Sequence, residues 1–503
     1  MSLFRRKPLD QLIAEGGDAE HGLRKTLTWI DLIALGIGAI IGAGIFATLG
    51  SATSGGTGAP PAGPGVTVSI LITALACTFC ALCYAEFASL VPIAGSAYSY
   101  AYATLGELVA WIIGWDLILE YAVGNIAVAI SWAAYFRQLV AGFGVVLPAW
   151  MCTDFRSTLL AAQAAAEAGA ASLSPELSIA LQAHDNHPVL FGVPIVFNLL
   201  AVGITAFITW LLVIGIKESV RFNNVVVVLK LITLLFFIGV GAFYVKPENW
   251  HPFFPGGFHG VWTGASLIFF AYIGFDAIST AAEECEDAGR DMPRGILGSL
   301  VICTVLYVAA ALVLTGMIPF GKLVGAADPL ALAFSYVKQD WAAGLLAFGA
   351  VVAMTAVLLV FQLGQPRILM AMARDGLLSP WFARIHPKYR TPHVSTILTG
   401  LFVGFFSAIA NIDEIVQLTN IGTLFAFVLV CIGILILRKR EPDRPRKFRV
   451  PFSPWTPMLG ILMCVWLMAG LPLLTWIRFI LWLLVGLALY FTYGARRSRL
   501  AAR

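Results

Sequence analysis

The apolar stretch L-G-I-G-A-I-I-G-A-G-I-F, at residues 35–46, contains four glycines: Gly36, Gly38, Gly42 and Gly44. A glycine inside a helix costs roughly 0.5–1 kcal/mol relative to alanine, so this density predicts a break in a membrane helix. The backbone N–H groups freed at a break, at the start of a half-helix, suit a carboxylate. The alternative interpretation is a G-x-x-x-G contact, Gly38 to Gly42, between two intact helices.

A second apolar run, F-F-A-Y-I-G-F-D at residues 269–276, is interrupted by Gly274 and by the charged Asp276. It lies in the sixth predicted span, five spans after the first interruption. Because five is odd, the second set of spans crosses the membrane in the opposite direction to the first. Two glycine-interrupted spans at corresponding positions of inverted repeats indicate the substrate site of a transporter. This correspondence favours a broken first helix.

Several charged side chains fall within apolar runs, where a charge costs at least about 2.5–3.5 kcal/mol. Lys230, in N-N-V-V-V-V-L-K-L-I-T-L-L-F-F, lies too deep to reach the interface, which favours a functional role over a structural ion pair. Glu120 either faces a substrate cavity or pairs with a neighbour. Glu86 is predicted to be a structural anchor, and Asp116 and Asp276 are predicted to hold helix ends.

The composition indicates a polytopic membrane protein. Of 503 residues, 59% are hydrophobic and only 12% are charged, and the mean hydropathy is +0.86. A soluble protein carries about 25% charged residues. No H-E-x-x-H, G-x-S-x-G or Walker motif is present, so we expect no enzyme, no catalytic residue, no cofactor and no nucleic-acid partner.

The cysteines raise the question of a metal site. Cys77, Cys80 and Cys83 recur at helical spacing, but no histidine or carboxylate cluster accompanies them. We therefore interpret them as small packing residues, and expect neither a metal nor a disulfide framework.

Apolar runs mark about twelve spans. They lie near residues 30–50, 66–91, 106–140, 190–216, 222–245, 260–284, 295–317, 342–373, 394–410, 413–437, 457–474 and 476–494. Basic residues gather after the eighth and tenth spans and at the C-terminus, so both termini are predicted to be cytoplasmic. The longest external loop, near residues 141–189, contains the stretch L-L-A-A-Q-A-A-A-E-A-G-A-A-S-L, which is predicted to form one surface helix.

This pattern divides an all-α integral membrane protein into six parts. They are a cytoplasmic tail (1–29), spans 1–5 (30–245), spans 6–10 (246–437), a basic loop (438–456), spans 11–12 (457–494) and a C-terminal cytoplasmic tail (495–503).

Four motifs carry a family resemblance: G-I-G-A-I-I-G-A-G-I-F, C-Y-A-E-F-A-S, F-F-A-Y-I-G-F-D and A-M-A-R-D-G-L-L. With them, the chain from near Leu23 to near Tyr493 resembles the amino acid–polyamine–organocation superfamily, in the bacterial branch of its cationic amino acid transporter family. The resemblance implies a 5+5 inverted repeat with broken helices 1 and 6, plus two extra helices. It also implies uptake of L-amino acids across the cell membrane by alternating access, driven by protons rather than sodium.

The resemblance also implies a set of site residues. The substrate carboxylate would bind backbone N–H groups at the first break, formed by Ile40, Ile41, Gly42, Ala43 and Gly44. The substrate amine would meet backbone carbonyls of Phe270, Ala271 and Ile273, with the Phe270 ring as a lid. Glu120 completes the predicted substrate site.

Lys230 matches a fifth-span lysine that members of this type hold where sodium-coupled relatives bind sodium, which implies proton coupling. Its ammonium is expected to donate to carbonyls near residues 36–39 and to the hydroxyl of Thr355. Phe361, in V-L-L-V-F-Q-L-G-Q-P-R, matches an eighth-span position that faces the substrate side chain and is small in cation-selective members. A bulky phenylalanine there favours small neutral amino acids such as alanine.

Other functions are open at this point. The alternatives are import or exchange of arginine and lysine, or an amino acid sensor that does not transport. A channel would need a continuous pore lined by carbonyl or charge rings, which two isolated breaks do not supply. The substrate, the proton and the lipid bilayer are the expected partners.

Overall fold

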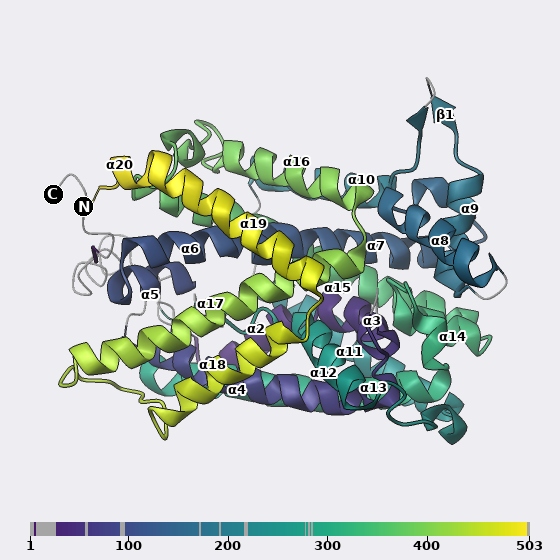
Figure 1. Ribbon diagram of the computed structural model, residues 1–503, viewed down its shortest axis with the longest axis horizontal. Coiled ribbons are helices and arrows are strands. Elements are labelled where there is room, and N and C mark those ends of the chain that lie inside the picture. The colour runs from purple at the N-terminus through teal and green to yellow at the C-terminus, as the bar shows by residue number, and fades with distance from the viewer. Residues whose placement is uncertain are drawn as a thin grey trace.

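The computed structural model describes residues 5–6, 27–55, 59–90, 96–170, 173–190, 193–215, 220–276, 278–279, 282 and 285–499. The regular secondary structure of these residues is helical, apart from a short antiparallel pair of strands, β1 (Val189–Leu190) and β2 (Val193–Pro194). Most of the long helices run along the longest axis of the molecule (Figure 1). Helices suit a lipid environment because all their backbone hydrogen bonds are made within one segment.

Eight helices among the described residues are long and apolar enough to cross a membrane. They are Trp29–Ser54, Gly63–Leu90, Glu107–Ala141, Val225–Tyr244, Ala288–Met317, Asp340–Arg374, Ile412–Arg440 and Leu473–Arg497. Three shorter apolar helices overlap further predicted spans: α10 (Leu199–Ile214), α16 (His393–Ile409) and α18 (Trp455–Ala469). The chain is therefore a helical multi-pass membrane protein.

Described residues near both chain ends meet at Glu107, the first residue of α6 (Glu107–Ile118). The N–H of Glu107 donates to the carbonyl of Arg5 at 2.8 Å, and the hydroxyl of Ser498 donates to its carboxylate. Tyr490 donates to the other carboxylate oxygen at 3.0 Å. Both ends of the chain therefore lie at one end of the bundle, as an even number of spans requires. Most of the predicted N-terminal tail lies outside the described residues.

At the opposite end, the loop that was expected to hold one helix holds two, α8 (Phe155–Ala168) and α9 (Pro175–Asp185) (Figure 1). The helix predicted in the stretch 159–173 is confirmed in α8, whereas α9 was not predicted. A stop and a start lie between the two helices. Gly169 ends α8 at a φ of 84°, which favours glycine, and Ser174 caps α9 by accepting from the N–H of Leu177.

Glu86 confirms its predicted role as a structural anchor. It lies near the end of α4 (Val66–Leu90) and is fully buried. Its carboxylate accepts from Nε of Arg438 at 3.0 Å and from the N–H of Val450 at 2.7 Å, and Nε of Arg446 lies 3.2 Å away. One buried carboxylate thus holds the basic segment that follows α17 (Ile412–Arg440) against α4.

We expect Glu86→Gln to lower the free energy of unfolding by about 3 kcal/mol, because it leaves the buried guanidinium of Arg446 and the partly buried one of Arg438 without a counter-charge. The measurement is thermal unfolding of the detergent-solubilised protein, followed by size-exclusion chromatography. The matched control is Glu441→Gln, which removes a half-exposed partner of Arg444 and should cost less than about 1 kcal/mol. Equal melting temperatures for the two variants would contradict the anchor.

Candidate functional site

The first interruption separates α2 (Trp29–Ile40) from a π-helical turn, η1 (Gly44–Thr48), which continues into α3 (Leu49–Ser54). Ile41 has an extended backbone, with φ −75° and ψ 100°, and neither it nor Gly42 belongs to a helix. The structure therefore has the broken form and not the intact packed pair. The first N–H groups of the half-helix that begins after the break have no partner within it.

The second interruption follows α12 (Gly257–Ile268), where the chain tightens into a 3-10 turn, η8 (Phe269–Tyr272), and then extends at Ile273. Gly274 has a φ of 114°, a conformation that favours glycine. A Cβ at Gly274 would lie 2.8 Å from the carbonyl oxygen of Ala39. The second break therefore lies directly against the last turn of α2.

The two breaks also meet at Gly44. A Cβ added at Gly44 would lie 2.3 Å from Cα of Ala271, much closer than a real contact allows. At Gly42 the added Cβ would lie 2.6 Å from a methyl group of Val357, on α15 (Asp340–Arg374). Glycine is needed at Gly44 because two interrupted backbones touch there.

Tyr307, from α13 (Ala288–Met317), joins the two breaks. Its buried hydroxyl lies 2.9 Å from the carbonyl oxygen of Ile40 and 3.0 Å from that of Ala271. A hydroxyl has one proton, so it donates to one of these carbonyls at a time. Sequence reasoning missed this residue, because a tyrosine in an apolar run looks like ordinary packing. A substrate amine at Ala271 would share that carbonyl with Tyr307.

Lys230, on α11 (Val220–Gly241), is buried and donates from Nζ to the carbonyl of Gly38 at 2.8 Å. This acceptor lies within the predicted range of residues 36–39. The second predicted acceptor, Thr355, was wrong: its hydroxyl accepts from the indole of Trp132 at 2.9 Å and donates to the carbonyl of Val351. No carboxylate among the described residues forms an ion pair with Lys230. The ammonium therefore ties α11 to α2 just before the first break.

Glu120 lies in a π-helical turn, η3 (Leu119–Val123), between α6 and α7 (Gly124–Ala141). It is buried against the carboxyl of Asp276 and the hydroxyl of Thr423. Of the two interpretations of Glu120, the structure therefore favours a pair with a neighbour, and that neighbour is in the second break. Asp116 lies in the last turn of α6, but its carboxyl has no hydrogen-bond partner among the described residues, so the prediction that its side chain holds a helix end was wrong.

Phe361, on α15, lies near Phe270 of the second break. A Cβ added at Gly124 would lie 3.5 Å from the Phe361 ring, 3.8 Å from the Phe270 ring and 3.3 Å from the methyl group of Thr419. The Phe361 ring also packs edge-on against Tyr121, with centroids 5.6 Å apart. Four helical segments thus meet at one largely apolar point beside Gly124. Gly124 and Thr419 carried no signal in the sequence.

The predicted site residues are all buried: Ile40, Ile41, Gly42, Ala43, Gly44, Glu120, Lys230, Phe270, Ala271, Ile273 and Phe361. They come together in the middle of the bundle, in the region where the two interruptions touch. The conformation is therefore closed around this region.

The cysteines of the membrane helices form a cluster elsewhere. Sγ of Cys80 lies 3.4 Å from Sγ of Cys464 and 3.9 Å from Sγ of Cys431, and all three are buried. In the part of the chain that the structure describes, no group of three or more His, Cys, Asp or Glu side chains is placed to hold a metal ion.

The structure thus has two interrupted helices in contact and a buried lysine beside one of them. Comparison with known proteins agrees with this arrangement. A model of the amino acid permease family matches residues 27–496. The chain belongs to the amino acid permease family. This permease is thus a membrane transporter rather than an enzyme, as the sequence motifs predicted.

Three relatives of this chain are named for different substrates. The branched-chain amino acid permease BcaP of Bacillus subtilis is 45% identical over 499 residues, which cover 99% of each chain. The methylthioribose transporter of the same species is 43% identical over 499 residues, which also cover 99% of each chain. The vacuolar cationic amino acid transporter 4 of Arabidopsis thaliana is 35% identical over 454 residues, 88% of this chain and 68% of the relative.

Replacement of Gly44 tests the contact between the breaks. Gly44→Ala should lower uptake at least about tenfold, because its Cβ would force Ala271 away. The control is Gly239→Ala on α11, where an added Cβ meets nothing within 4 Å. Both variants should reach the membrane in equal amounts. Wild-type uptake by Gly44→Ala would show that the breaks need not touch.

Proposed function

We propose that this permease imports small neutral L-amino acids by proton-coupled alternating access. The observation that carries the proposal is the contact between the two interruptions, with Gly44 against Ala271. The N–H groups after the first break suit the substrate carboxylate, and the carbonyls of the second break suit its ammonium. Both poles of an amino acid are thus matched by backbone groups that helix breaks set free.

The proposed topology has twelve spans. It adds the interrupted span, residues 260–284, to the eight long and three shorter apolar helices. Spans 1–5 and 6–10 form the inverted repeat, and the last two spans lie outside it. Both termini are cytoplasmic in this proposal, because the basic residues gather at the end of the bundle where Glu107 contacts Arg5.

The residues packed around Gly124 support a neutral substrate. The rings of Phe361 and Phe270 are apolar. Gly124 has no side chain, and Thr419 turns its methyl group toward Gly124. Glu120 is the one carboxylate that the sequence predicted for the substrate site. It is buried against Asp276, which makes it a poor partner for a cationic side chain. The relative named for branched-chain amino acids also favours an aliphatic substrate. Because the methylthioribose relative is almost as similar, a thio-sugar is the second candidate substrate.

Lys230 supports coupling to protons. Its ammonium holds the carbonyl of Gly38 at 2.8 Å, close to the first break, with no carboxylate partner among the described residues. Loss of the proton would remove one charged donor and weaken the link between α11 and α2. Proton release and helix movement would then be one event, which is the requirement for a coupled transporter.

The selectivity prediction concerns Phe361→Ser. The smaller side chain should let arginine compete for alanine binding at least about tenfold better than in the wild type, because the space beside Gly124 grows. The gain should be a relaxation of specificity, since no counter-charge is added. The measurement is competition by unlabelled amino acids and methylthioribose. Phe348→Ser, on the exposed face of the same helix, is the control. Tighter binding of arginine than of alanine to the wild type would exclude a neutral preference.

The coupling prediction concerns Lys230→Ala. Uptake into vesicles should rise as the external pH falls, without sodium, and this variant should no longer accumulate substrate above the external concentration. Substrate exchange at equal pH should survive, because the variant removes the coupling group and not the substrate site. Lys322→Ala, at an exposed lysine, is the control. Accumulation that follows a sodium gradient and ignores the pH gradient would exclude the mechanism.

A further inference from the structure

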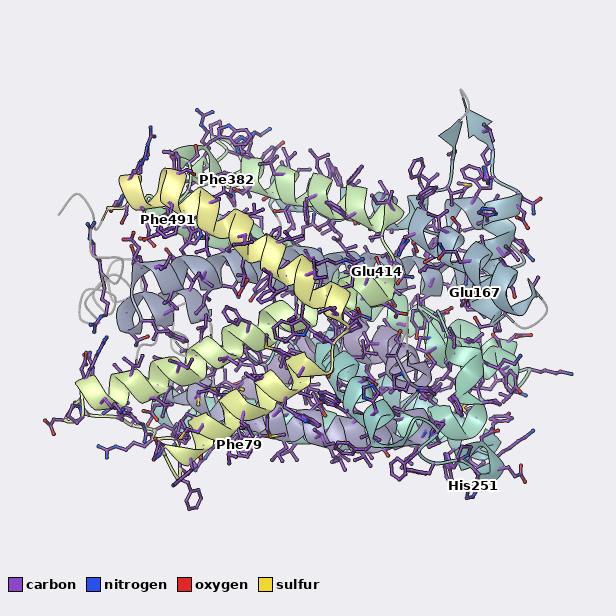
Figure 2. All side chains as sticks on the ribbon, viewed as in Figure 1. Phe79, Glu167, His251, Phe382, Glu414 and Phe491 are labelled. Carbon is purple, nitrogen blue, oxygen red and sulfur yellow. The ribbon has the colours of Figure 1, made fainter. Side chains whose placement is uncertain are left out.

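A cavity of about 390 Å³ lies beneath the α8–α9 hairpin, at the end of the bundle opposite Glu107. Its walls come from α7, α8, α9, the segment 324–327 and the start of α17. Figure 1 shows α8 and α9 together at this end, and Figure 2 labels Glu167 on α8 and Glu414 near the start of α17. The volume is within the range of small-molecule sites, about 300–1,000 Å³.

The hairpin is fixed over the cavity by polar contacts to its walls. Arg137, near the end of α7, donates to both carboxylate oxygens of Glu176 on α9, at 2.7 and 2.9 Å. Asn411, just before α17, donates to the hydroxyl of Ser157 on α8 at 2.9 Å. Ser174 donates to the carbonyl of Val324 at 2.7 Å. The hairpin therefore covers the cavity as a structured roof.

The cavity walls carry an excess of carboxylates. Asp154, Glu167, Glu176 and Asp413 line the cavity, and Arg137 is the one cationic lining residue among those described. Asp154 and Asp413 are 4% exposed. Burial raises the pKa of Asp154 to about 7, although hydrogen bonds from Ser157 oppose this. A ligand ammonium would stabilise the charged form of these buried carboxyls, so the cavity suits a ligand that carries one.

Arg137 offers a place for a carboxylate in the same cavity. Both of its contacts with Glu176 come from one nitrogen, Nη2. A guanidinium has five N–H donors, so the groups on its other nitrogens can serve a ligand. Apolar side chains, among them Ile130 and Leu160, complete the lining. An ammonium, a carboxylate and an aliphatic part are the features of an amino acid.

We propose that this cavity is a second, outer binding site for amino acids, separate from the central site, with the α8–α9 hairpin as its roof. The ammonium binds on the side of Asp154 and Asp413, and the carboxylate binds Arg137. The choice of an amino acid as ligand rests on the proposed function. Because of the acidic excess, this outer site accepts lysine, which the apolar central space disfavours.

The outer site has a direct link to the first break. The hydroxyl of Ser51, on the half-helix α3, donates to the carboxylate of Asp413 at 2.5 Å. Both residues are buried. A ligand ammonium at Asp413 would bind the same carboxylate, whose two oxygens can accept from both donors. The outer site and the half-helix whose first turn forms the central site therefore share this carboxylate.

The test is equilibrium binding of radiolabelled L-lysine to the purified full-length protein. We expect one saturable lysine site per chain in the wild type, and this site should still be present in Gly44→Ala, because that change lies at the central site. Ala164→Trp fills the cavity and should weaken lysine binding at least tenfold. Ala166→Trp, on the same helix and outside the lining, should bind as the wild type does.

A second pair of variants tests the charge. Asp154→Asn should also weaken lysine binding about tenfold, since its amide oxygen can still cap α8 while the charge is lost. Asp185→Asn, at an exposed carboxylate, should leave lysine binding unchanged. The proposal is overturned if the wild type shows no saturable lysine site, if Ala164→Trp binds normally, or if Gly44→Ala abolishes binding. A failure of the proposed function would instead appear as absent or pH-independent alanine uptake.

Discussion

The contact between two interrupted backbones governs the middle of this protein. In lipid, a backbone group without a partner is costly, so an unwound segment must be buried in protein. Here each break is buried partly by the other, with Gly44 against Ala271 and Gly274 against Ala39. Tyr307 adds a hydroxyl between the two carbonyls. A larger residue at either glycine would separate the breaks and expose the groups that a substrate is proposed to bind.

Each break also has a charged side chain brought to it by a neighbouring helix. Lys230 reaches the carbonyl of Gly38 beside the first break, and Glu120 lies against Asp276 in the second. Charges at this depth are costly. The ammonium of Lys230 is held by a backbone carbonyl, and the carboxyl of Glu120 is held by a second carboxyl. Under the proposed function, a change in the proton content of either group would alter contacts at a break, where small movements open or close the site.

The two ends of the bundle are held in different ways. At one end, two buried carboxylates make the ties. Glu86 ties the basic segment to the transmembrane helices, and Glu107 ties both chain ends to them. At the other, the α8–α9 hairpin is held by contacts to three elements and encloses a cavity. Ser51 and Asp413 connect that cavity to the half-helix after the first break. The proposed outer and central sites are therefore joined by one short segment.

The sequence by itself determined the apolar spans, the two interruptions and the charges of Glu86 and Lys230 within apolar runs, because apolar length, glycine density and a charge in an apolar run are features of short stretches. The acceptor region of Lys230 was expected from the family resemblance. Only the tertiary structure decided which groups meet across the bundle. Tyr307 at both breaks, Gly124 beside Phe361, and the cavity under α8 and α9 each join segments far apart in the chain. Thr355 was assigned to Lys230 wrongly for the same reason: the indole of Trp132, more than two hundred residues away, occupies its hydroxyl. Periodicity places a side chain along its own helix, whereas packing between helices selects its partner.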